Sequence, residues 1–424
     1  MIRYQRLIST YLLCILATLA IAQPSSNSPY TRYGFGQLSD QQFASGMAMG
    51  GIAYGLRNGL QINAANPASY TAVDSLTFIF DAGLSLQNTN FKDGDTKTNA
   101  KNSSLDYIAM QFRLRKGLAM TAGFLPYSTV GYNMTQVTPD HGEDIYGDKI
   151  ESYQTLSGNG GLQQVFVGMG WNIFKNFAIG ANISYLYGDI TRSVIRSFYD
   201  TNATSSVRTE KLDIRDYKLD LGAQYTQKIG EKHVVNLGAI YSYGHKLNGE
   251  GYNYTETYDS NSTLQTHSGD TISNAFSIPH TFGIGMTYVY NKKLTVGLDY
   301  TLQKWADCTY FNKENQYSDR TKISLGAEYL PNIEGRKFMD FVRYRMGVHY
   351  TSPYIKVNGQ EGPREYGVSM GVGLPLFRSR SILNISGQYT KVSPKVKGML
   401  EENYLRLNIG LTFNEGWFMK YKVE

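Results

Sequence analysis

Fourteen segments of this chain alternate apolar residues with polar or small ones, and the connections between the segments are short and long in turn. In one segment, every second residue from Leu76 to Leu86 is apolar, whereas Thr77, Asp81 and Ser85 are among the residues between them. A β-strand directs alternate side chains to opposite faces, so one face of such a strand suits lipid and the other suits water. The alternation therefore predicts an all-β chain that crosses a membrane as a closed barrel.

A soluble β-sandwich is the main alternative, because its strands also alternate. Sandwich strands are usually about 5 to 6 residues long, whereas segments such as residues 177–193 are much longer. The chain also holds 34 tyrosines, and pairs such as Tyr185 with Tyr187 and Tyr241 with Tyr243 lie where apolar rows approach segment ends. Rings at these positions are typical of the aromatic girdles of outer-membrane barrels.

The segments predict a 14-stranded antiparallel transmembrane β-barrel, and an even strand number places both chain ends in the periplasm. Tight periplasmic turns are expected at residues 115–117, 174–176, 228–232, 290–293 and 376–380. Long polar outer loops are expected at 88–103, 129–158, 194–212, 248–277, 307–318, 352–363 and 392–401. The expected strands lie near 74–87, 104–115, 117–128, 160–172, 177–193, 213–227, 233–247, 278–290, 293–306, 319–330, 340–351, 364–374, 381–391 and 402–413.

The first 22 residues are expected to form an export signal. Arg3 and Arg6 precede an apolar run that ends in an A-x-A cleavage site at residues 20–22. Beyond it, no apolar stretch is long enough for a transmembrane helix, and Cys308 is the only remaining cysteine. An exported chain of alternating strands belongs in a bacterial outer membrane.

Residues 23–72 do not alternate, and they are rich in glycine. Sequence such as Met47 to Ala53 is too apolar for a solvated linker. A barrel of fourteen strands encloses a lumen that its own side chains do not fill. We therefore expect four regions: a signal peptide (1–22), an amino-terminal hatch that plugs the lumen (23–72), the barrel (73–413) and a periplasmic tail (414–424).

The hatch carries a family resemblance. The pair Gly50 and Gly51, followed by Asn66, Pro67 and Ala68 just ahead of the first strand, resembles the hatch of the FadL and TodX transporters of hydrophobic compounds, closest to Bacteroidota-type members. Asn caps helix starts and Pro suits the first helical position, so this tripeptide can set a short helical turn. The resemblance covers the mature chain and implies a channel in which a strand kink opens a lateral gate to lipid.

Charged residues of both signs occupy the lumen-facing positions of the predicted strands. They can pair across the barrel and against the hatch, or line a polar path in which arginines bind carboxylates or phosphates. The set comprises Arg113, Arg115, Lys218, Asp220, Asp299, Lys322, Glu328, Arg343, Arg345, His349, Glu365 and Arg406.

Enzymatic chemistry is not expected. Residues 367–371 match the G-x-S-x-G pattern of serine hydrolases, but they lie inside an alternating strand, where Ser369 is an inward-facing small residue. The six histidines lack metal-ligand spacing, and no cofactor motif is present. Acidic clusters at residues 93–95 and 140–148 could hold calcium, although such clusters are usually solvated loop faces. The mild net charge of +6 comes with no nucleic-acid-binding motif.

Two functions remain. The resemblance implies passive uptake of a hydrophobic or amphipathic small molecule past the hatch. The alternative is a non-transporting accessory barrel of an outer-membrane complex, such as type IX secretion or barrel assembly, with lipid and other outer-membrane proteins as partners. It is favoured by the polar composition of residues 248–277, which offer a hydrophobe little apolar contact. A general diffusion porin is disfavoured by the hatch.

Overall fold

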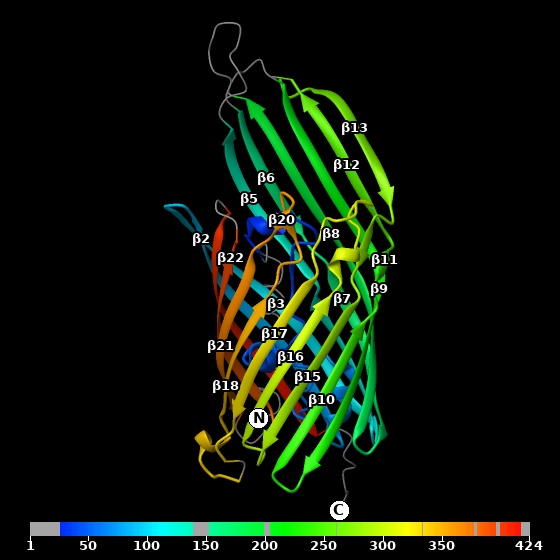
Figure 1. Cartoon of the computed structure of the whole chain (residues 1–424), viewed down its shortest axis with the longest axis vertical. Helices are drawn as coiled ribbons and strands as arrows, with labels where there is room; N and C mark the ends of the chain where they lie inside the picture. The colour runs from blue at the N-terminus through cyan, green and yellow to red at the C-terminus, as the bar shows by residue number, and fades with distance from the viewer. Residues whose placement is uncertain are drawn as a thin grey trace, which may run out of the picture.

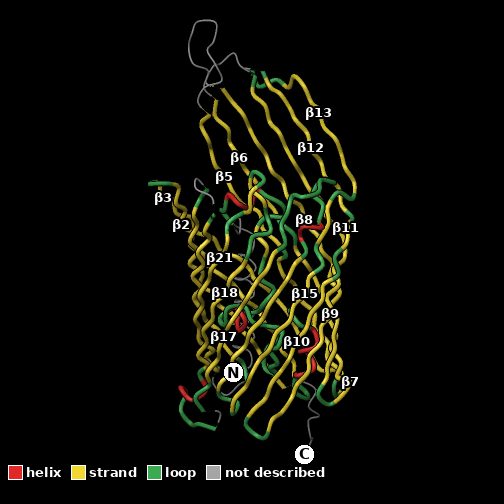
Figure 2. The backbone as a smooth tube through the Cα atoms, viewed as in Figure 1, coloured by secondary structure: helices red, strands yellow, loops and turns green. Residues whose placement is uncertain are grey.

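The computed structural model describes residues 26–138, 152–198, 204–259, 261–332, 334–376, 380–395 and 399–416. They form a closed antiparallel barrel whose wall has fourteen staves (Figures 1 and 2). We use stave for one strand position in the wall, which in some cases is divided into two or three successive strands. The staves are β2 (Thr77–Asp93), β3 (Thr96–Arg115), β4 (Leu118–Pro126) with β5 (Ser128–Thr138), β6 (Ser152–Gly160) with β7 (Gln163–Phe174), β8 (Phe177–Phe198), β9 (Ser205–Ile229), β10 (His233–Ser242) with β11 (His245–Leu247) and β12 (Gly249–Tyr258), β13 (Leu264–Ser273) with β14 (Phe276–Ile278) and β15 (Thr281–Tyr290), β16 (Leu294–Gln303), β17 (Arg320–Tyr329), β18 (Arg343–Thr351), β21 (Arg364–Pro375), β22 (Ile382–Ser393) and β23 (Glu401–Gly416).

The barrel closes between its first and last staves. β2 pairs with β23 from Thr77 opposite Gly416 to Lys92 opposite Glu401. The last strand therefore continues to Gly416, three residues beyond the predicted barrel end at residue 413. Residues 1–25 and 417–424, which contain the predicted signal peptide and most of the predicted tail, lie outside the described residues.

The alternation in the sequence matches the two faces of the wall. In β2, Asp81 and Ser85 are buried on the inside, whereas Leu86 is half exposed on the outside. Other apolar side chains on the outside, such as Met346 and Met370, are more than half exposed. This arrangement is the outward apolar band and polar interior of an outer-membrane barrel. No helix among the described residues is long and apolar enough to cross a membrane.

Several segments predicted as outer loops are strands. Residues 129–138 and 152–158 belong to β5 and β6, and β12 and β13 occupy most of residues 248–277. Together with the long strands β8 and β9, they form a tall sheet that rises beyond the rest of the barrel (Figure 1). β12 and β13 carry few apolar residues because both of their faces meet water, whereas β5 and β6 direct Val130, Tyr132 and Leu156 into the barrel. None of these extensions has the lipid-facing apolar row used to find strands.

Inside the barrel, residues 26–73 follow an irregular path, and we refer to this segment as the hatch. It contains η1 (Pro29–Arg32), β1 (Gln37–Leu38), α2 (Ala44–Met47) and η2 (Pro67–Ala72). Its first described residues lie at the long-loop end, where Ser28 donates a hydrogen bond to Glu402 at the outer end of β23. The hatch therefore runs from the long-loop end towards the short-turn end, where η2 precedes β2. The placement of both chain ends in the periplasm stays a prediction.

Candidate functional site: the hatch and the lumen

The Asn66-Pro67-Ala68 tripeptide forms the predicted helical turn. Asn66 is the N-cap of η2, its side chain accepts a hydrogen bond from Ala68 N at 3.2 Å, and Pro67 occupies the first helical position. The Asn66 amide also donates to Tyr54 O at 2.8 Å and to Ala223 O on the wall at 3.3 Å. The motif thus ties a local turn, a distant part of the hatch and the barrel wall together.

Glycines allow the hatch backbone to approach the wall. Gly50 and Gly51 have φ of +69° and +88°, which side-chain-bearing residues rarely adopt. On the wall, a Cβ at Gly238 would lie 1.8 Å from Tyr54 O, and one at Gly347 would lie 2.2 Å from Gly50 N. The sequence analysis did not single out these wall glycines, although glycine at lumen-facing positions of several strands was a usable signal.

Polar side chains of the wall hold the hatch backbone. The Asp299 carboxylate accepts hydrogen bonds from Ala53 N at 2.5 Å and Tyr54 N at 2.8 Å. The Ser369 hydroxyl accepts from Gly50 N at 2.9 Å and donates to Ala48 O at 3.1 Å. The serine of the G-x-S-x-G pattern is therefore a hatch contact within a strand, and the nucleophile turn that hydrolysis requires is not formed there.

An apolar core fills the long-loop end of the lumen around Phe35 of the hatch. The Phe35 ring lies 5.9 Å from the ring of Trp305 in η3 (Trp305–Asp307) and 6.4 Å from that of Phe276 in β14. Arg192 from β8 reaches into this core and pairs with Glu210 at 2.9 Å, and its guanidinium also donates to Gly34 O. This packing covers the outer mouth with side chains from the hatch and from the loops. Among the described residues, its buried members are Phe35, Tyr127, Val130, Tyr132, Leu156, Leu162, Leu186, Ile190, Leu212, Ile214, Leu247, Ala275, Phe276, Ile278, Trp305, Cys308, Tyr317, Tyr354, Ile355 and Val357.

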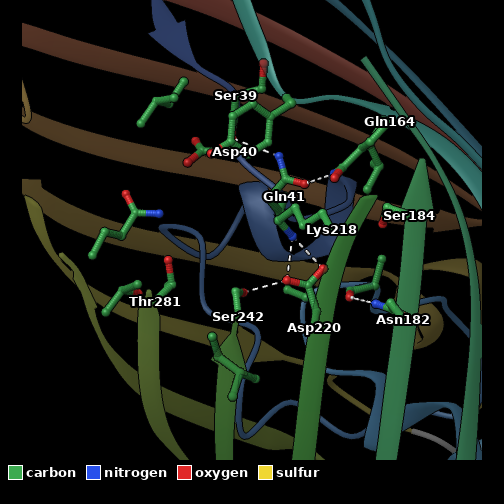
Figure 3. A pocket seen from close by; sticks show the side chains of 18 of the residues that line it. Ser39, Asp40, Gln41, Gln164, Asn182, Ser184, Lys218, Asp220, Ser242 and Thr281 are labelled. Atoms are coloured by element: carbon green, nitrogen blue, oxygen red, sulfur yellow. Dashed lines mark hydrogen bonds and ion pairs between the residues drawn. The ribbon is translucent and has the colours of Figure 1, made fainter. Parts of the chain in front are cut away.

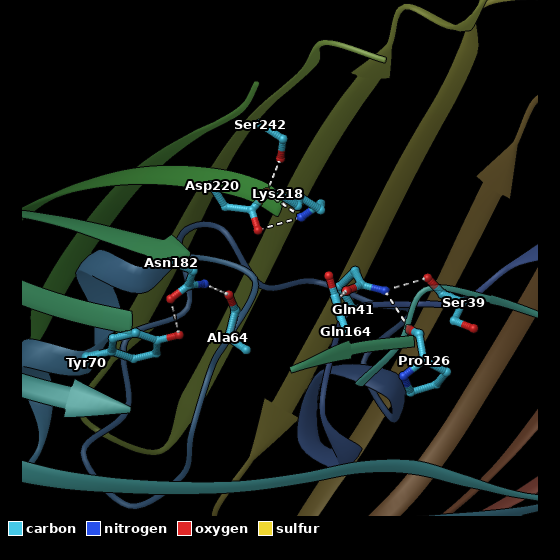
Figure 4. A network of polar contacts seen from close by, with 10 residues as sticks. All are labelled: Ser39, Gln41, Ala64, Tyr70, Pro126, Gln164, Asn182, Lys218, Asp220 and Ser242. Carbon is cyan, nitrogen blue, oxygen red and sulfur yellow. Dashed lines mark hydrogen bonds and ion pairs between the residues drawn. The ribbon is translucent and has the colours of Figure 1, made fainter. Parts of the chain in front are cut away.

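Cavities of about 120 and 360 Å³ lie beneath this core, and both are lined by a mixture of apolar and polar side chains. Residues 38–40 of the hatch and Arg320 of β17 line both cavities and separate them. In the smaller cavity, Asp220 pairs with Lys218 and accepts a hydrogen bond from Ser242 (Figure 3). On the hatch side, Gln41 donates to Ser39 O and Pro126 O, and Gln164 donates to Gln41 (Figure 4).

An ion pair anchors the hatch between the cavities. Lys322 Nζ lies 2.5 Å from Asp40 Oδ1, and the lysine side chain is 10% exposed. Burial of the Asp40 carboxyl raises its pKa, but the nearby ammonium of Lys322, together with other basic side chains around it, more than offsets this effect. The pKa of Asp40 is therefore held well below its ordinary value.

A second charged cluster lies nearer the short-turn end. Glu328 accepts from Arg343 at 2.8 Å and from Arg345 at 2.7 Å. Arg345 also donates to Asn384 at 2.6 Å, and Gln61 of the hatch donates to the same oxygen at 3.3 Å. A buried charge that lost its partner would be strongly destabilising. This cluster joins three wall strands and the hatch.

The other predicted lumen residues are spread over different levels. His349, Glu365 and Arg406 line the larger cavity, where Arg406 donates two hydrogen bonds to Gln87. Arg113 donates to Ser75 Oγ at 2.8 Å near the short-turn end, and Arg115 is exposed at the end of β3. The twelve charged residues therefore do not form one common binding site.

The wall is discontinuous beside the larger cavity. β3 pairs with β4 from Arg115 to Ile108, which lies opposite Phe124. The other half of β3, from Thr96 to Tyr107, pairs with β2 alone among the described residues. The neighbouring stave is interrupted at Tyr127, and β5 pairs on that edge with the two hatch residues of β1. The β2–β3 hairpin turns away from β5 (Figure 1). Residues of β3 and of β5, the strands on the two sides of this break, contribute to the lining of the larger cavity.

The acidic clusters considered for calcium receive no geometric support in the described part of the chain. Asp93 ends β2 as an exposed residue, and residues 140–148 lie outside the described part of the chain. Among the described residues, no group of three or more His, Cys, Asp and Glu side chains could hold a metal ion.

The fold is that of outer-membrane channels for hydrophobic compounds. The chain matches the toluene transporter TbuX of Ralstonia pickettii (TM-score 0.60, 13% identity, covering 88% of this chain and 98% of that one). It matches a Pseudomonas aeruginosa FadL homologue similarly (0.61, 12%, 89% and 99%), and the P. putida toluene transporter TodX (0.59, 14%, 90% and 100%). These solved relatives are transport channels, and identities this low establish the shared fold alone. No curated protein matches the chain significantly.

The chain thus shares the fold of FadL-type outer-membrane β-barrels. Within this class, the family model BamG matches residues 1–424, and the chain belongs to the BamG family.

Proposed function

We propose that this protein is an accessory barrel of an outer-membrane protein complex, in which the hatch and the outer core keep the lumen closed. The observation that carries the proposal is the tall sheet of β5, β6, β8, β9, β12 and β13. β13 pairs with β12 on one side, and its other edge has no partner among the described residues. Its ten residues are nearly all exposed. Soluble proteins usually protect long edge strands, because a free edge can pair with another chain.

The lumen supports the same proposal. A path for hydrophobic molecules needs apolar walls, but charged side chains such as Asp106, Arg320 and Arg406 line much of the larger cavity. The outer mouth is filled by the core around Phe35.

The test is to replace residues 249–274, which hold β12 and β13, with a two-residue turn. The β11–β14 pairing, from His245 opposite Ile278 to Leu247 opposite Phe276, remains to close the shortened hairpin. As a control, the β2–β3 tip at residues 92–97 is shortened on the opposite side of the mouth. The proposal predicts that tagged wild-type protein purifies from its own membrane with stoichiometric partners, and that only the first variant loses them. Retention of all partners by a variant that still shows a folded barrel's heat-dependent gel mobility would contradict it.

Uptake of an amphipathic molecule is the second candidate, and the discontinuous wall between β3 and β5 favours it. A molecule could enter the larger cavity from the membrane through this break. Ser104 of β3 lines that cavity, so S104W should fill it and weaken binding of a dansyl-labelled fatty acid to the purified barrel. Lack of binding to the wild-type barrel, together with unchanged growth on hydrophobic compounds after gene deletion, would reject uptake.

A further inference from the structure

The connection between β17 and β18 differs from the other turns at the short-turn end. Residues 330–342 include η4 (Phe338–Phe341), whereas the β3–β4 and β7–β8 connections have two residues each. Leu330 and Val342, at the base of this connection, are buried. Asp340 holds it together, since its carboxylate accepts from Lys337 N at 3.0 Å and its carbonyl accepts from Asn332 N at 3.0 Å.

This ordered connection nevertheless presents apolar side chains outward. Phe338 and Met339 are 56% and 58% exposed, and Phe341 is 37% exposed. Exposed apolar surface costs roughly 25 cal/mol per Å² in water. Because the hydrogen bonds of Asp340 fix the turn, these side chains cannot withdraw without breaking it. The surface is therefore built to be covered.

The position of the exposed apolar side chains and the charges beside them indicate what covers this surface. The turn lies at the outer contour of the barrel, beside β18 and beyond the end of the wall (Figure 1). It continues the lipid-facing surface of β17, where Tyr329 is 49% exposed. Arg336 and Lys337, which precede the apolar residues directly, are also exposed, and the acidic Glu334 lies two residues before Arg336. Apolar side chains next to cations fit the boundary between acyl chains and phosphate-bearing headgroups.

We propose that residues 334–341 form a foot that inserts into the headgroup layer of the periplasmic membrane leaflet and binds phospholipid phosphates through Arg336 and Lys337. The foot fixes the height and rotation of the barrel in the membrane. Its occupant is lipid, and the foot is present in the isolated barrel without any protein partner. The proposal is independent of the accessory function.

Spin labelling tests the foot in the full-length protein. In a C308S background, which removes the only cysteine after the predicted signal peptide, a nitroxide is attached at M339C or, as a control, at K116C in the two-residue β3–β4 turn. The barrel is reconstituted alone in vesicles of phosphatidylethanolamine and phosphatidylglycerol. We expect the label at residue 339 to collide more with oxygen than with a water-soluble nickel chelate, and the label at residue 116 to show the reverse.

A second measurement tests the charge. R336Q combined with K337Q should shift the label at residue 339 towards the aqueous reagent, with the largest shift in vesicles containing phosphatidylglycerol. Two results would overturn the proposal: a label at residue 339 that is as water-accessible as the one at residue 116, or one whose accessibility does not respond to the double substitution. The first result would point to a surface that a periplasmic protein covers.

Discussion

The Asp299 carboxylate, on the inner face of β16, accepts a hydrogen bond from the backbone N–H of Tyr54 in the hatch at 2.8 Å. The same oxygen accepts from Ala53 N. One wall side chain thus accepts hydrogen bonds from two successive backbone N–H groups of the hatch, which has no regular secondary structure at this point. Irregular backbone inside a barrel needs such partners, because its polar groups are otherwise unsatisfied.

Removal of this carboxylate should loosen the hatch. Hydrogen bonds to charged groups contribute about 1.5 to 3 kcal/mol, so D299A should raise the time spent in a conducting state roughly 10- to 100-fold. Single-channel conductance in planar bilayers measures this change, and D299N should have a smaller effect because it keeps one acceptor oxygen. If D299A conducts no more than the wild type, Asp299 does not hold the hatch closed.

Added bulk at the wall glycines should displace the hatch. G238V places a side chain where Tyr54 O now lies, and overpacking of this kind costs about 1 to 3 kcal/mol. G387V is the matched control, since a Cβ there meets nothing within 4 Å. We expect faster proteolysis of the hatch in G238V alone, with the barrel folded in both. Equal proteolysis of the two variants would show that the close approach at Gly238 is dispensable.

The cap at Asn66 should contribute to hatch stability. N66A removes the acceptor for Ala68 N and the donor to Tyr54 O, and loss of a helix cap alone typically costs about 1 kcal/mol. Hydrogen exchange of residues 66–72, read by mass spectrometry, should accelerate roughly fivefold or more. N66D, which keeps the acceptor, should recover part of the protection. Unchanged exchange in N66A would assign the protection to packing instead.

The Asp40–Lys322 pair should resist mild acid. A carboxylate whose pKa is depressed in the folded state stabilises that state above its ordinary pKa of about 3.9, and this stabilisation is lost only as the pH falls through the depressed value. Conductance should therefore stay constant between about pH 8 and pH 5 as far as this pair controls it. D40N should conduct more across the whole range. A conductance rise in the wild type near pH 5 that D40N abolishes would contradict the assignment.

The strands that cross the membrane could be predicted because lipid on one side and a polar lumen on the other impose a period of two. Residues 74–87 and 293–306 are examples, and they correspond to β2 and β16. The upper parts of β5, β6, β12 and β13 escaped prediction, since no lipid-facing apolar row marks them. The extent of these strands is determined by pairing, of β6 with β8 and β5 and of β12 with β9 and β13, which a single sequence does not reveal.

The hatch could be predicted in part. Asn66 and the glycine pair carry a local backbone signal, and the structure gives each a role in a turn or a close approach. The partners of the lumen charges could not be predicted, because Lys322 finds Asp40 across 282 residues of sequence. The core around Phe35 was missed for a similar reason. Its members come from loops and strands without a shared period, so only the folded barrel brings them together.

Native purification from the source membrane in mild detergent tests the proposed function most directly. Mass spectrometry would identify both the co-purifying proteins and the extracted small molecules. The account predicts a stoichiometric complex with other outer-membrane proteins and no enriched hydrophobic compound in the barrel. A solitary barrel that carries a lipid or another hydrophobic molecule at stoichiometric level would contradict the accessory function and support uptake.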